Sequence, residues 1–390
     1  MISCNRDESS GQNKLLLVSI DGFRADYFDL YETPNLDYIA ENGVLADYMI
    51  PVFPTKTFPN HYSIATGLFV ENSGIISNNM YDPETDRYYS LGNRGSVQDA
   101  SWYSGEPIWV TAEKQGIPSA PLFWPGSEAP IGGSYATYWS PYDDDLPYSA
   151  RVDSVINWLQ IEDETAPGFM TLYFSKVDSY GHWYGPESDS VATAVQEVDQ
   201  QIGYLLNELD RINYRDQLNM IFVSDHGMIE ISEDKIIRLD ELFNLEDAEI
   251  IDWAPVTKIR PDDGKTDEIY RNLKESERNY TVYRKSDIPQ EYGYKNHLRV
   301  PEIILVASPG YTVTSSERLA GSEIAGGNHG YLHTASEMRS LFLAMGPDIK
   351  RGIKSAPFQN IHLYELMAKL MNIEPSPNDG KLDSVKHILN

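Results

Sequence analysis

Six acidic and histidine side chains lie in four short segments of this chain, most of them close behind apolar runs. They are Asp21 after KLLLVSI, Asp178 and His182 in KVDSYGHWYG, Asp225 and His226 in LNMIFVSDHG, and His329 in GGNHGY. Imidazole nitrogen and carboxylate oxygen are ligands that Zn²⁺ accepts readily, and a catalytic zinc keeps an open position. Two such metal sites side by side would suit phosphoryl chemistry.

Each segment alone also fits an ordinary turn, because Asp commonly follows a strand and His-Gly is a frequent turn sequence. The occurrence of all four favours a metal site. A fifth segment, VFPTKTFPNHYSIATGL, places Thr57 before a short apolar run that Gly67 would close as a helix. Free N–H groups at a helix N-terminus attract anions. Thr57 is therefore predicted to be an N-cap, to lie beside a phosphate, or both.

The composition limits the partners. The chain has 31 Lys and Arg against 59 Asp and Glu, a formal charge of −28. This balance argues against tracking along nucleic acid and against binding to an anionic membrane surface. A phosphate site in such a chain must be locally positive, and bound metal ions would supply that charge.

The hydrophobic pattern predicts an α/β fold. Nearly continuous apolar runs at 14–20, 169–174, 218–224 and 339–345 read as strands buried on both faces. Thr33 and Pro34 indicate the start of a helix that ends near Gly43. The spacing of apolar residues predicts two further helices, over 152–159 and 191–209. The alternation predicts a mostly parallel central sheet with helices on both faces and with ligands at the carboxyl ends of the strands.

The domain organisation follows from the same pattern. The sequence shows no low-complexity linker or internal repeat between residues 14 and 390, which favours a single catalytic domain. The periodicity weakens between His226 and His329, where charges are frequent. We expect an inserted subdomain at about 230–325. After it, the chain would return to the main domain, where His329 would join the other candidate ligands.

Eight segments occur in the order and spacing of the nucleotide pyrophosphatase/phosphodiesterase family, within the alkaline phosphatase superfamily. They are LLLVSIDGFRADYF, PTKTFPNHYSIATGL, GIISNNMYDP, GEPIWVTAEKQG, LFWPGSE, VDSYGHWYGP, SDHGM and GNHGY. The chain resembles this family from about residue 14 to about residue 375. The resemblance implies an alkaline-phosphatase-like fold, two Zn²⁺ ions per chain, and hydrolysis of nucleotide phosphodiester or pyrophosphate bonds that releases nucleoside monophosphates.

By position, the resemblance implies roles for individual residues. One zinc would be held by Asp178, His182 and His329, and the other by Asp21, Asp225 and His226, with Thr57 at its open position. Thr57 would be the nucleophile, because the family pattern places it directly before Phe-Pro-Asn, which excludes Thr55. Asn78 would hold a phosphoryl oxygen.

The chemistry of these groups is consistent with that assignment. Zinc coordination lowers the pKa of a hydroxyl and so replaces a general base, which leads to a covalent threonyl-phosphate. The amide of Asn78 and the backbone N–H beside Thr57 would add neutral donors. Neutral donors suit the single charge of a phosphodiester better than the two charges of a monoester.

Aromatic residues suggest a nucleotide substrate. Phe58 and a cluster that includes Tyr138, Trp139 and Tyr142 could stack on a base, although a chain with 26 Tyr and 7 Trp also exposes aromatics without function. The resemblance implies that Phe58 and an aromatic near Trp139 clamp the base. It also implies that FWPGSEAPIGGSYATYW fills the space which autotaxin, a lysophospholipid-cleaving relative, leaves open, and this favours nucleotides over lysolipids.

The residues also leave other classes of activity open. A phosphodiesterase could instead act on lysophospholipids or choline-phosphate-type diesters, a monoesterase would bring an arginine to the phosphate, and a sulfatase needs a Cys or Ser nucleophile in a Cys/Ser-x-Pro-x-Arg setting. A non-catalytic glycan-binding surface lipoprotein would have no reason to place histidines in this pattern. The other histidines are expected to be structural or exposed: His61, His297, His333, His362 and His387.

The N-terminal sequence MISCNRDESSGQNK resembles a processed bacterial lipoprotein. On this interpretation Cys4 carries lipid, residues 1–13 are a flexible tether, and the protein is periplasmic or attached to the outer membrane. The alternative is an N-terminal tail without function. No apolar run in the sequence approaches the roughly 18 residues that a membrane span requires.

Overall fold

A computed structural model describes residues 14–321 and 323–390. Cys4 and the expected tether at 1–13 lie outside the described residues. Within the described part of the chain, no helix combines the length and apolar character needed to cross a membrane.

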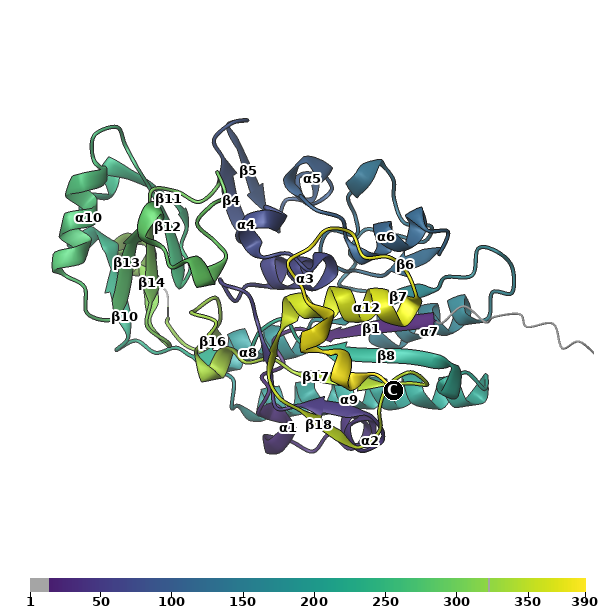
Figure 1. The fold of residues 1–390 in the computed structure, drawn as a ribbon. Coiled ribbons are helices and arrows are strands. Elements are labelled where there is room, and N and C mark those ends of the chain that lie inside the picture. Colours follow the sequence, from purple (N-terminus) through teal and green to yellow (C-terminus); the bar gives the residue numbers. More distant parts are fainter. Residues whose placement is uncertain (1–13, 322) are drawn as a thin grey trace, which may run out of the picture.

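The molecule is built on a seven-stranded sheet in the order β18-β2-β17-β8-β1-β7-β6 (Figure 1). Strands β6, β7, β1 and β8 run parallel, β18 and β2 run parallel, and β17 is antiparallel to β8 and β2. The predicted mostly parallel α/β sheet is therefore confirmed. Its strands are Lys14–Ile20 (β1), Val44–Ala46 (β2), Ser119–Pro121 (β6), Phe169–Phe174 (β7), Leu218–Val223 (β8), Phe342–Met345 (β17) and Ile353–Ser355 (β18).

Strand β1 shows why the apolar runs are nearly continuous. Its side chains alternate between two cores, because successive residues of a strand point to opposite faces. Leu15 and Leu17 enter one core, while Leu16, Val18 and Ile20 enter the other. Both faces of the sheet are covered, so most of these side chains are apolar, and the one buried polar side chain, Ser19, has a partner in His61.

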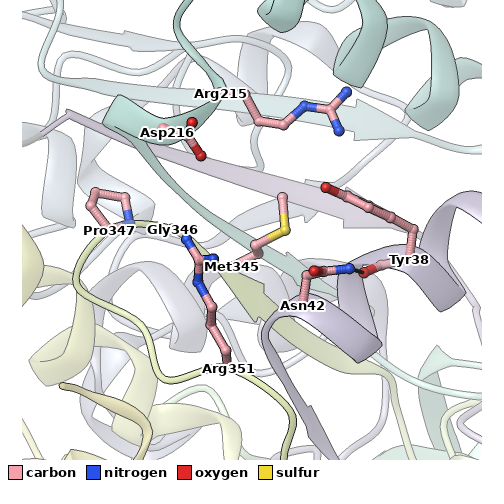
Figure 2. Close-up of a pocket in the computed structure, with 8 residues that line it drawn as sticks. All are labelled: Tyr38, Asn42, Arg215, Asp216, Met345, Gly346, Pro347 and Arg351. Atoms are coloured by element: carbon pink, nitrogen blue, oxygen red, sulfur yellow. Dashed lines mark hydrogen bonds between the residues drawn. The ribbon is translucent and has the colours of Figure 1, made fainter.

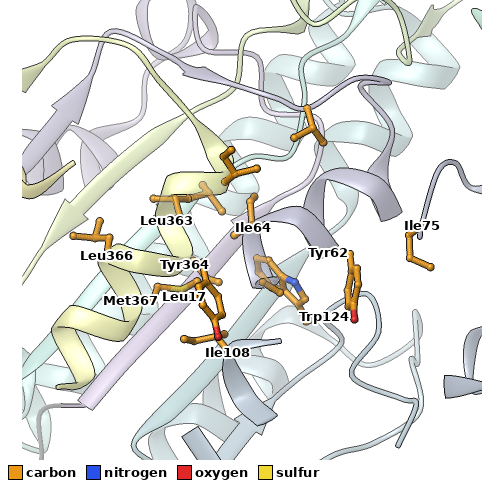
Figure 3. Close-up of a cluster of buried hydrophobic side chains, with 14 of the residues drawn as sticks. Leu17, Tyr62, Ile64, Ile75, Ile108, Trp124, Leu363, Tyr364, Leu366 and Met367 are labelled. Atoms are coloured by element: carbon orange, nitrogen blue, oxygen red, sulfur yellow. The ribbon is translucent and has the colours of Figure 1, made fainter. Parts of the chain in front are cut away.

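Helices α3 (Thr57–Thr66), α6 (Ile108–Lys114) and α12 (Leu363–Met371) cover the first face. Figure 3 shows Leu17 of β1 among side chains of these helices, including Ile64, Ile108 and Leu366. Gly67 ends α3 in the left-handed conformation, with φ of 68°, as its position after the apolar run predicts.

Helices α2 (Pro34–Asn42), α7 (Tyr148–Leu159) and α9 (Asp189–Arg211) cover the second face. The sequence predicted α2 from its capping residues and the other two helices from periodicity. The apolar stripe of α9 is buried along its whole length: Val191, Val195, Val198, Ile202, Leu205 and Leu209. The stripe fits the requirement for a helix that packs one face on a sheet.

A second, four-stranded antiparallel sheet lies at one end of the molecule (Figure 1). Its order is β11-β12-β14-β13, and it has a core of its own with α10. This separate core supports the proposal of an inserted subdomain at about 230–325. The elements are Ala248–Asp252 (β11), Val256–Pro261 (β12), Thr266–Glu275 (α10), Tyr280–Arg284 (β13) and Ile303–Ala307 (β14).

The remaining α-helices and strands of the described chain are short. They are Tyr27–Leu30 (α1), Met49–Ile50 (β3), Val70–Ser73 (α4), Asn79–Asp82 (β4), Arg87–Ser90 (β5), Arg94–Val97 (α5), Lys176–Tyr184 (α8), Ile229–Glu230 (β9), Ile236–Arg238 (β10), Thr312–Thr314 (β15), Ser316–Leu319 (α11), Gly327–Asn328 (β16) and Phe358–Gln359 (β19).

Candidate active site

The fold brings the six candidate ligands to one edge of the central sheet. Asp21 directly follows β1, Asp225 and His226 follow β8, and α8 begins just after β7. The carboxyl ends of parallel strands share one edge, where ligands of open α/β sheets bind. Asp178 and His182 are one helical turn apart on α8 and so share a face. His329 follows β16, which lies against α8.

Two groups of ligand atoms result. In the first, Asp178 Oδ1 lies 3.6 Å from His182 Nε2 and 3.7 Å from His329 Nε2. In the second, His226 Nε2 lies 3.6 Å from Asp21 Oδ1 and 3.0 Å from Asp225 Oδ2. Ligand atoms of a tetrahedral zinc, at bond lengths of about 2.0–2.2 Å, lie about 3.3–3.6 Å apart.

The two groups adjoin one another. The imidazole rings of His226 and His329 stack with centroids 3.5 Å apart. Asp178 also forms a possible ligand set with Asp21 and His226, which joins the two groups. Adjacent sites of this kind can bind one substrate group between two metal ions.

The three histidines are oriented by backbone carbonyls. A protonated Nδ1 that donates to a carbonyl fixes the tautomer and leaves the Nε2 lone pair for a metal. The three Nδ1 contacts are His182 to Gly327 O at 2.9 Å, His329 to Thr55 O at 2.9 Å and His226 to Gly227 O at 2.8 Å. All three imidazoles are thus arranged as Nε2 ligands.

The three carboxylates each offer one unpaired oxygen. Asp21 Oδ1, Asp178 Oδ1 and Asp225 Oδ2 are shielded from solvent and have no hydrogen-bond partner. The other oxygens of Asp21 and Asp225 are anchored, the first by Tyr173 Oη at 2.5 Å and the second by Gly22 N–H at 3.1 Å. Buried oxygens without a donor need a cation, so this set fits divalent metal ions.

The pKa values of the ligand residues are shifted by burial and by the charges of neighbouring ligands. Burial first, and then the charges of Asp225 and Asp178, raise the pKa of Asp21 well above its usual range. Burial and the neighbouring His226 lower the pKa of His329, which keeps this imidazole neutral as a metal ligand must be. Bound cations would reverse the shift of Asp21.

His61 forms a further possible ligand set, with Asp21 and Asp225. Its Nε2 lies 2.7 Å from Ser19 Oγ, and its Nδ1 lies 2.9 Å from the carbonyl of Thr57 and 3.4 Å from Asp225 Oδ2. Both ring nitrogens have protein partners, so His61 supports Asp225 and the first turn of α3. A structural role for His61 stays a prediction.

Thr57 is the first residue of α3, and its Oγ1 lies 3.3 Å from His226 Nε2. The N-cap position belongs to Lys56, so the interpretation of Thr57 as N-cap was wrong. The backbone of Lys56 is extended while Thr57 is already helical, which leaves the Thr57 hydroxyl free for the ligand cluster.

Thr55, the alternative candidate for the nucleophile, is fully buried. Its hydroxyl donates to Tyr331 O at 3.0 Å and accepts the N–H of Gly330 at 3.0 Å. Its carbonyl orients His329, so Thr55 serves the site through the backbone and not through its hydroxyl.

Asn78 lies next to the first turn of α3 and lines the same cavity as Thr57. Its Oδ1 accepts the backbone N–H of Phe58 at 3.0 Å, which leaves the amide nitrogen as a donor toward a bound oxygen. The N–H of Phe58, which we expected to donate to the phosphate, is therefore occupied, and the expectation of a free backbone donor there was wrong.

A cavity of about 370 Å³ opens beside these residues. Its wall includes the aromatic side chains Phe58, Phe123, Trp124, Tyr142 and Tyr173. Phe58 and Tyr142 were predicted from the sequence. Phe123 and Trp124 belong to the segment LFWPGSE, which carries part of the family resemblance, but the sequence does not show that they face a cavity. Tyr173 belongs to β7, and no local signal marks it as a cavity residue.

Tyr138 and Trp139 are not among the residues that line this cavity in the described structure. Trp139 stacks on Tyr135 with centroids 4.0 Å apart, and Tyr138 packs near Trp158. The backbone N–H of Tyr138 bonds to Ser119 O, at the amino end of β6, whereas the cavity lies at the carboxyl ends of the strands. Their assignment to substrate binding is corrected accordingly.

One arginine does reach the cavity wall. Arg94, at the start of α5, forms an ion pair with Glu128, which lines the same cavity. The charge of Arg94 is thus balanced by Glu128. The donor expected to face the phosphoryl oxygen remains the neutral amide of Asn78.

A smaller pocket lies at the opposite edge of the sheet, near the start of β8 and the end of β17 (Figure 2). It is lined by Tyr38, Asn42, Arg215, Asp216, Met345, Gly346, Pro347 and Arg351. One carboxylate and no imidazole line it, so it lacks the ligand set of a metal pair.

The geometry agrees with comparisons with known proteins. Residues 15–332 match the family described as Type I phosphodiesterase / nucleotide pyrophosphatase. The chain belongs to this family. It is a hydrolase acting on phosphodiester bonds, and the family resemblance and the alkaline-phosphatase-like fold are confirmed.

Individual relatives match over nearly the whole chain. Human ectonucleotide pyrophosphatase/phosphodiesterase family member 5 is 36% identical, over 97% of this chain and 78% of that protein. Bovine bis(5'-adenosyl)-triphosphatase is 37% identical, over 100% of this chain and 85% of that protein. A rattlesnake venom phosphodiesterase is 37% identical, but the chain spans only 46% of its length.

A solved structure of murine ectonucleotide pyrophosphatase/phosphodiesterase 5 matches with a TM-score of 0.92 and 36% identity. The match covers 97% of this chain and 100% of the murine chain. That structure is an inactive threonine-to-alanine variant in complex with AMP.

The predicted location was wrong. These relatives are human, bovine, murine and snake proteins, and several are named ectonucleotide enzymes, which overturns the bacterial periplasmic or outer-membrane lipoprotein interpretation. The error arose because a small residue before a cysteine, followed by polar residues, is a short pattern that unrelated N-termini also carry.

Proposed function

We propose that this protein hydrolyses phosphodiester and pyrophosphate bonds of nucleotides through a covalent threonyl-phosphate on Thr57 and releases nucleoside monophosphates. The observation that carries the proposal is the convergence of three unpaired carboxylate oxygens and three Nε2 atoms around the Thr57 hydroxyl, beside a cavity with aromatic walls. The murine AMP complex and the bovine bis(5'-adenosyl)-triphosphatase support a nucleotide substrate.

The ligand groups suit two Zn²⁺ ions. One would be held by Asp178, His182 and His329, and the other by Asp21, Asp225 and His226 together with the hydroxyl of Thr57. When bound, the ions lower the pKa of the hydroxyl and neutralise charge on the phosphoryl group. Mixed imidazole and carboxylate ligands favour zinc over magnesium or calcium.

The side chains of the protein account for the remaining steps. Thr57 Oγ1 attacks phosphorus and its hydroxyl proton passes to solvent, the bond from phosphorus to the leaving oxygen breaks, and the leaving group departs with its bonding electrons. The amide nitrogen of Asn78 donates to a non-bridging oxygen as charge builds on it. Water then attacks the same phosphorus and the bond from phosphorus to Thr57 Oγ1 breaks. Oγ1 takes up a proton, which restores the Thr57 hydroxyl, and the nucleoside monophosphate is released.

The aromatic wall would hold the base. Phe58 is half-buried and packs edge-on against Tyr89, with centroids 6.1 Å apart, while it lines the cavity next to Thr57. Tyr142 is held by Asp144 through its hydroxyl, at 2.6 Å, and by Phe123 through ring contact. A base that stacks on such rings gains about 1–3 kcal/mol.

Replacing Phe58 by alanine is expected to raise the KM for a nucleotide diester by about 5- to 150-fold, the equivalent of that stacking energy. A small alkyl aryl diester has no base to stack and should lose much less. The measurement is the ratio of kcat/KM for the two substrates.

Trp139→Ala is the matched control, because Trp139 is aromatic but lies outside the cavity. It should leave the ratio unchanged. If Phe58→Ala lowered kcat/KM equally for both substrates, Phe58 would only position Thr57 and the base would bind elsewhere.

The proposed function is tested by assaying an aryl phosphodiester and the matching monoester side by side, before and after chelation. We expect the diester to be strongly preferred, its hydrolysis to be lost on exhaustive chelation, and Zn²⁺ to restore it. Full diesterase activity in the chelated protein, or a preference for the monoester, would contradict the proposal.

A further inference from the structure

A buried ion pair in the small sheet contacts the residues on both sides of Asn78. Asp252 ends β11 and lies opposite Lys258 of β12 in the register of the two strands. Lys258 Nζ lies 3.2 Å from Asp252 Oδ2, and the side chains are 1% and 6% exposed. Taking two charges out of water costs several kcal/mol per ion before they attract one another. Because both charges are buried, the pair does not serve solubility, and its position in the fold needs another explanation.

Asp252 holds the segment that carries Asn78. Its Oδ2 accepts the hydroxyl of Ser77 at 2.6 Å, and its Oδ1 accepts the amide of Asn79 at 3.4 Å. The strand that contains Asp252 lies beside β4, which begins at Asn79 (Figure 1). One carboxylate therefore fixes the chain immediately before and immediately after Asn78.

Lys258 completes the arrangement. Its ammonium group donates to Asp252, to the hydroxyl of Ser77 at 3.0 Å and to the carbonyl of Val256 at 3.2 Å, which uses all three of its protons. Ser77 is fully buried. The Ser77 hydroxyl thus accepts from Lys258 and donates to Asp252, so its direction is determined from both sides.

We infer that Asp252 and Lys258 are positioning residues that set the amide of Asn78 against the phosphoryl group, so that the small sheet takes part in catalysis through Asn78. The inference rests on the proposed role of Asn78 as a donor. Neither residue lines the cavity, and their effect passes through Ser77 and Asn79. A donor displaced by a fraction of an ångström from the developing charge loses much of its effect.

A double-mutant cycle tests this inference on the zinc-loaded protein with an aryl phosphodiester. Asn78→Ala is expected to lower kcat by about 10²-fold, the typical effect of removing one transition-state donor. Asp252→Asn should lower kcat by about tenfold or more in the wild-type background and by less than about twofold in the Asn78→Ala background, because its target is then absent. Metal content should not change in either variant.

Glu249→Gln is the matched control. Glu249 lies on the same strand and pairs with Arg260 and Tyr88, away from Ser77. It should leave kcat unchanged in both backgrounds. If Asp252→Asn failed to fold, Ser77→Ala would take its place, since it removes the bridging hydroxyl and keeps the ion pair; we expect a loss of about fivefold that also disappears in the Asn78→Ala background.

Three results would overturn the inference. The first is an active Asp252→Asn or Ser77→Ala protein with unchanged kcat, and the second is an equal loss in both backgrounds. The third is an Asn78→Ala protein with full activity, which would also remove Asn78 from the proposed function. The first two leave the proposed function intact, so the failures are distinguishable.

Discussion

Thr57→Ala is expected to lower turnover of a nucleotide diester by about 10³-fold or more, because the attacking oxygen is lost while every other group remains. The three protein ligands of each proposed metal position are unchanged in this variant. Zinc content should therefore remain near two ions per chain. The measurements are single-turnover kinetics and metal analysis of the same preparation.

Two further variants control this experiment. Thr57→Ser keeps a hydroxyl and should retain a substantial part of the activity. Thr55→Ala removes a buried hydroxyl with two partners, so it should cost about 1–3 kcal/mol of stability but leave the chemical step nearly intact. If Thr55→Ala were the inactive variant and Thr57→Ala remained active, the assignment of the nucleophile would be wrong.

His329→Gln is expected to lower diesterase activity by about 10²-fold or more and to reduce the zinc content to about one ion per chain. The reason is that His329 Nε2 faces Asp178 Oδ1 at 3.7 Å and the glutamine amide is a poor zinc ligand. The other group, Asp21, Asp225 and His226, keeps all its members. Metal analysis and kcat/KM on the same sample provide the measurement.

His333→Gln is the matched control, four residues further along. His333 packs near Phe53 and Tyr292 and belongs to none of the possible ligand sets of the described structure. It should keep both zinc ions and near-normal activity. A His329→Gln protein with two zinc ions and full activity would show that His329 only packs against His226.

The sequence was most informative where local pattern and chemistry coincide. The apolar runs at 14–20 and 169–174 became β1 and β7, because a strand that is covered on both faces buries nearly all of its side chains and is therefore mostly apolar. Their parallel pairing then required Asp21 and α8, with Asp178 and His182, to meet at one edge. The order of these segments along the chain thus contained much of the geometry of the site.

The sequence was least informative about side chains whose place depends on distant packing. Tyr138 and Trp139 have the composition of a stacking platform, yet a backbone bond to Ser119 holds this segment at the amino end of β6. Tyr173 reads as one more residue of an apolar strand, although its hydroxyl anchors Asp21. No local signal distinguishes these cases.

Contacts between residues far apart in the chain could not be predicted from the sequence either. Asp252 and Lys258 lie 175 and 181 residues beyond Ser77 along the chain, and only the docking of the small sheet brings them together. The periodicity within 230–325 was weak because its strands are short and partly exposed. The contact of that region with the active site therefore emerged only from the structure.

The stereochemical course at phosphorus tests the central claim most directly. A phosphorothioate diester of known configuration is hydrolysed in water enriched in ¹⁸O, and the configuration of the product is determined. Each in-line displacement inverts phosphorus, so attack by Thr57 followed by attack of water should give overall retention. Overall inversion would mean that water attacks the substrate directly, and it would contradict a covalent threonyl-phosphate.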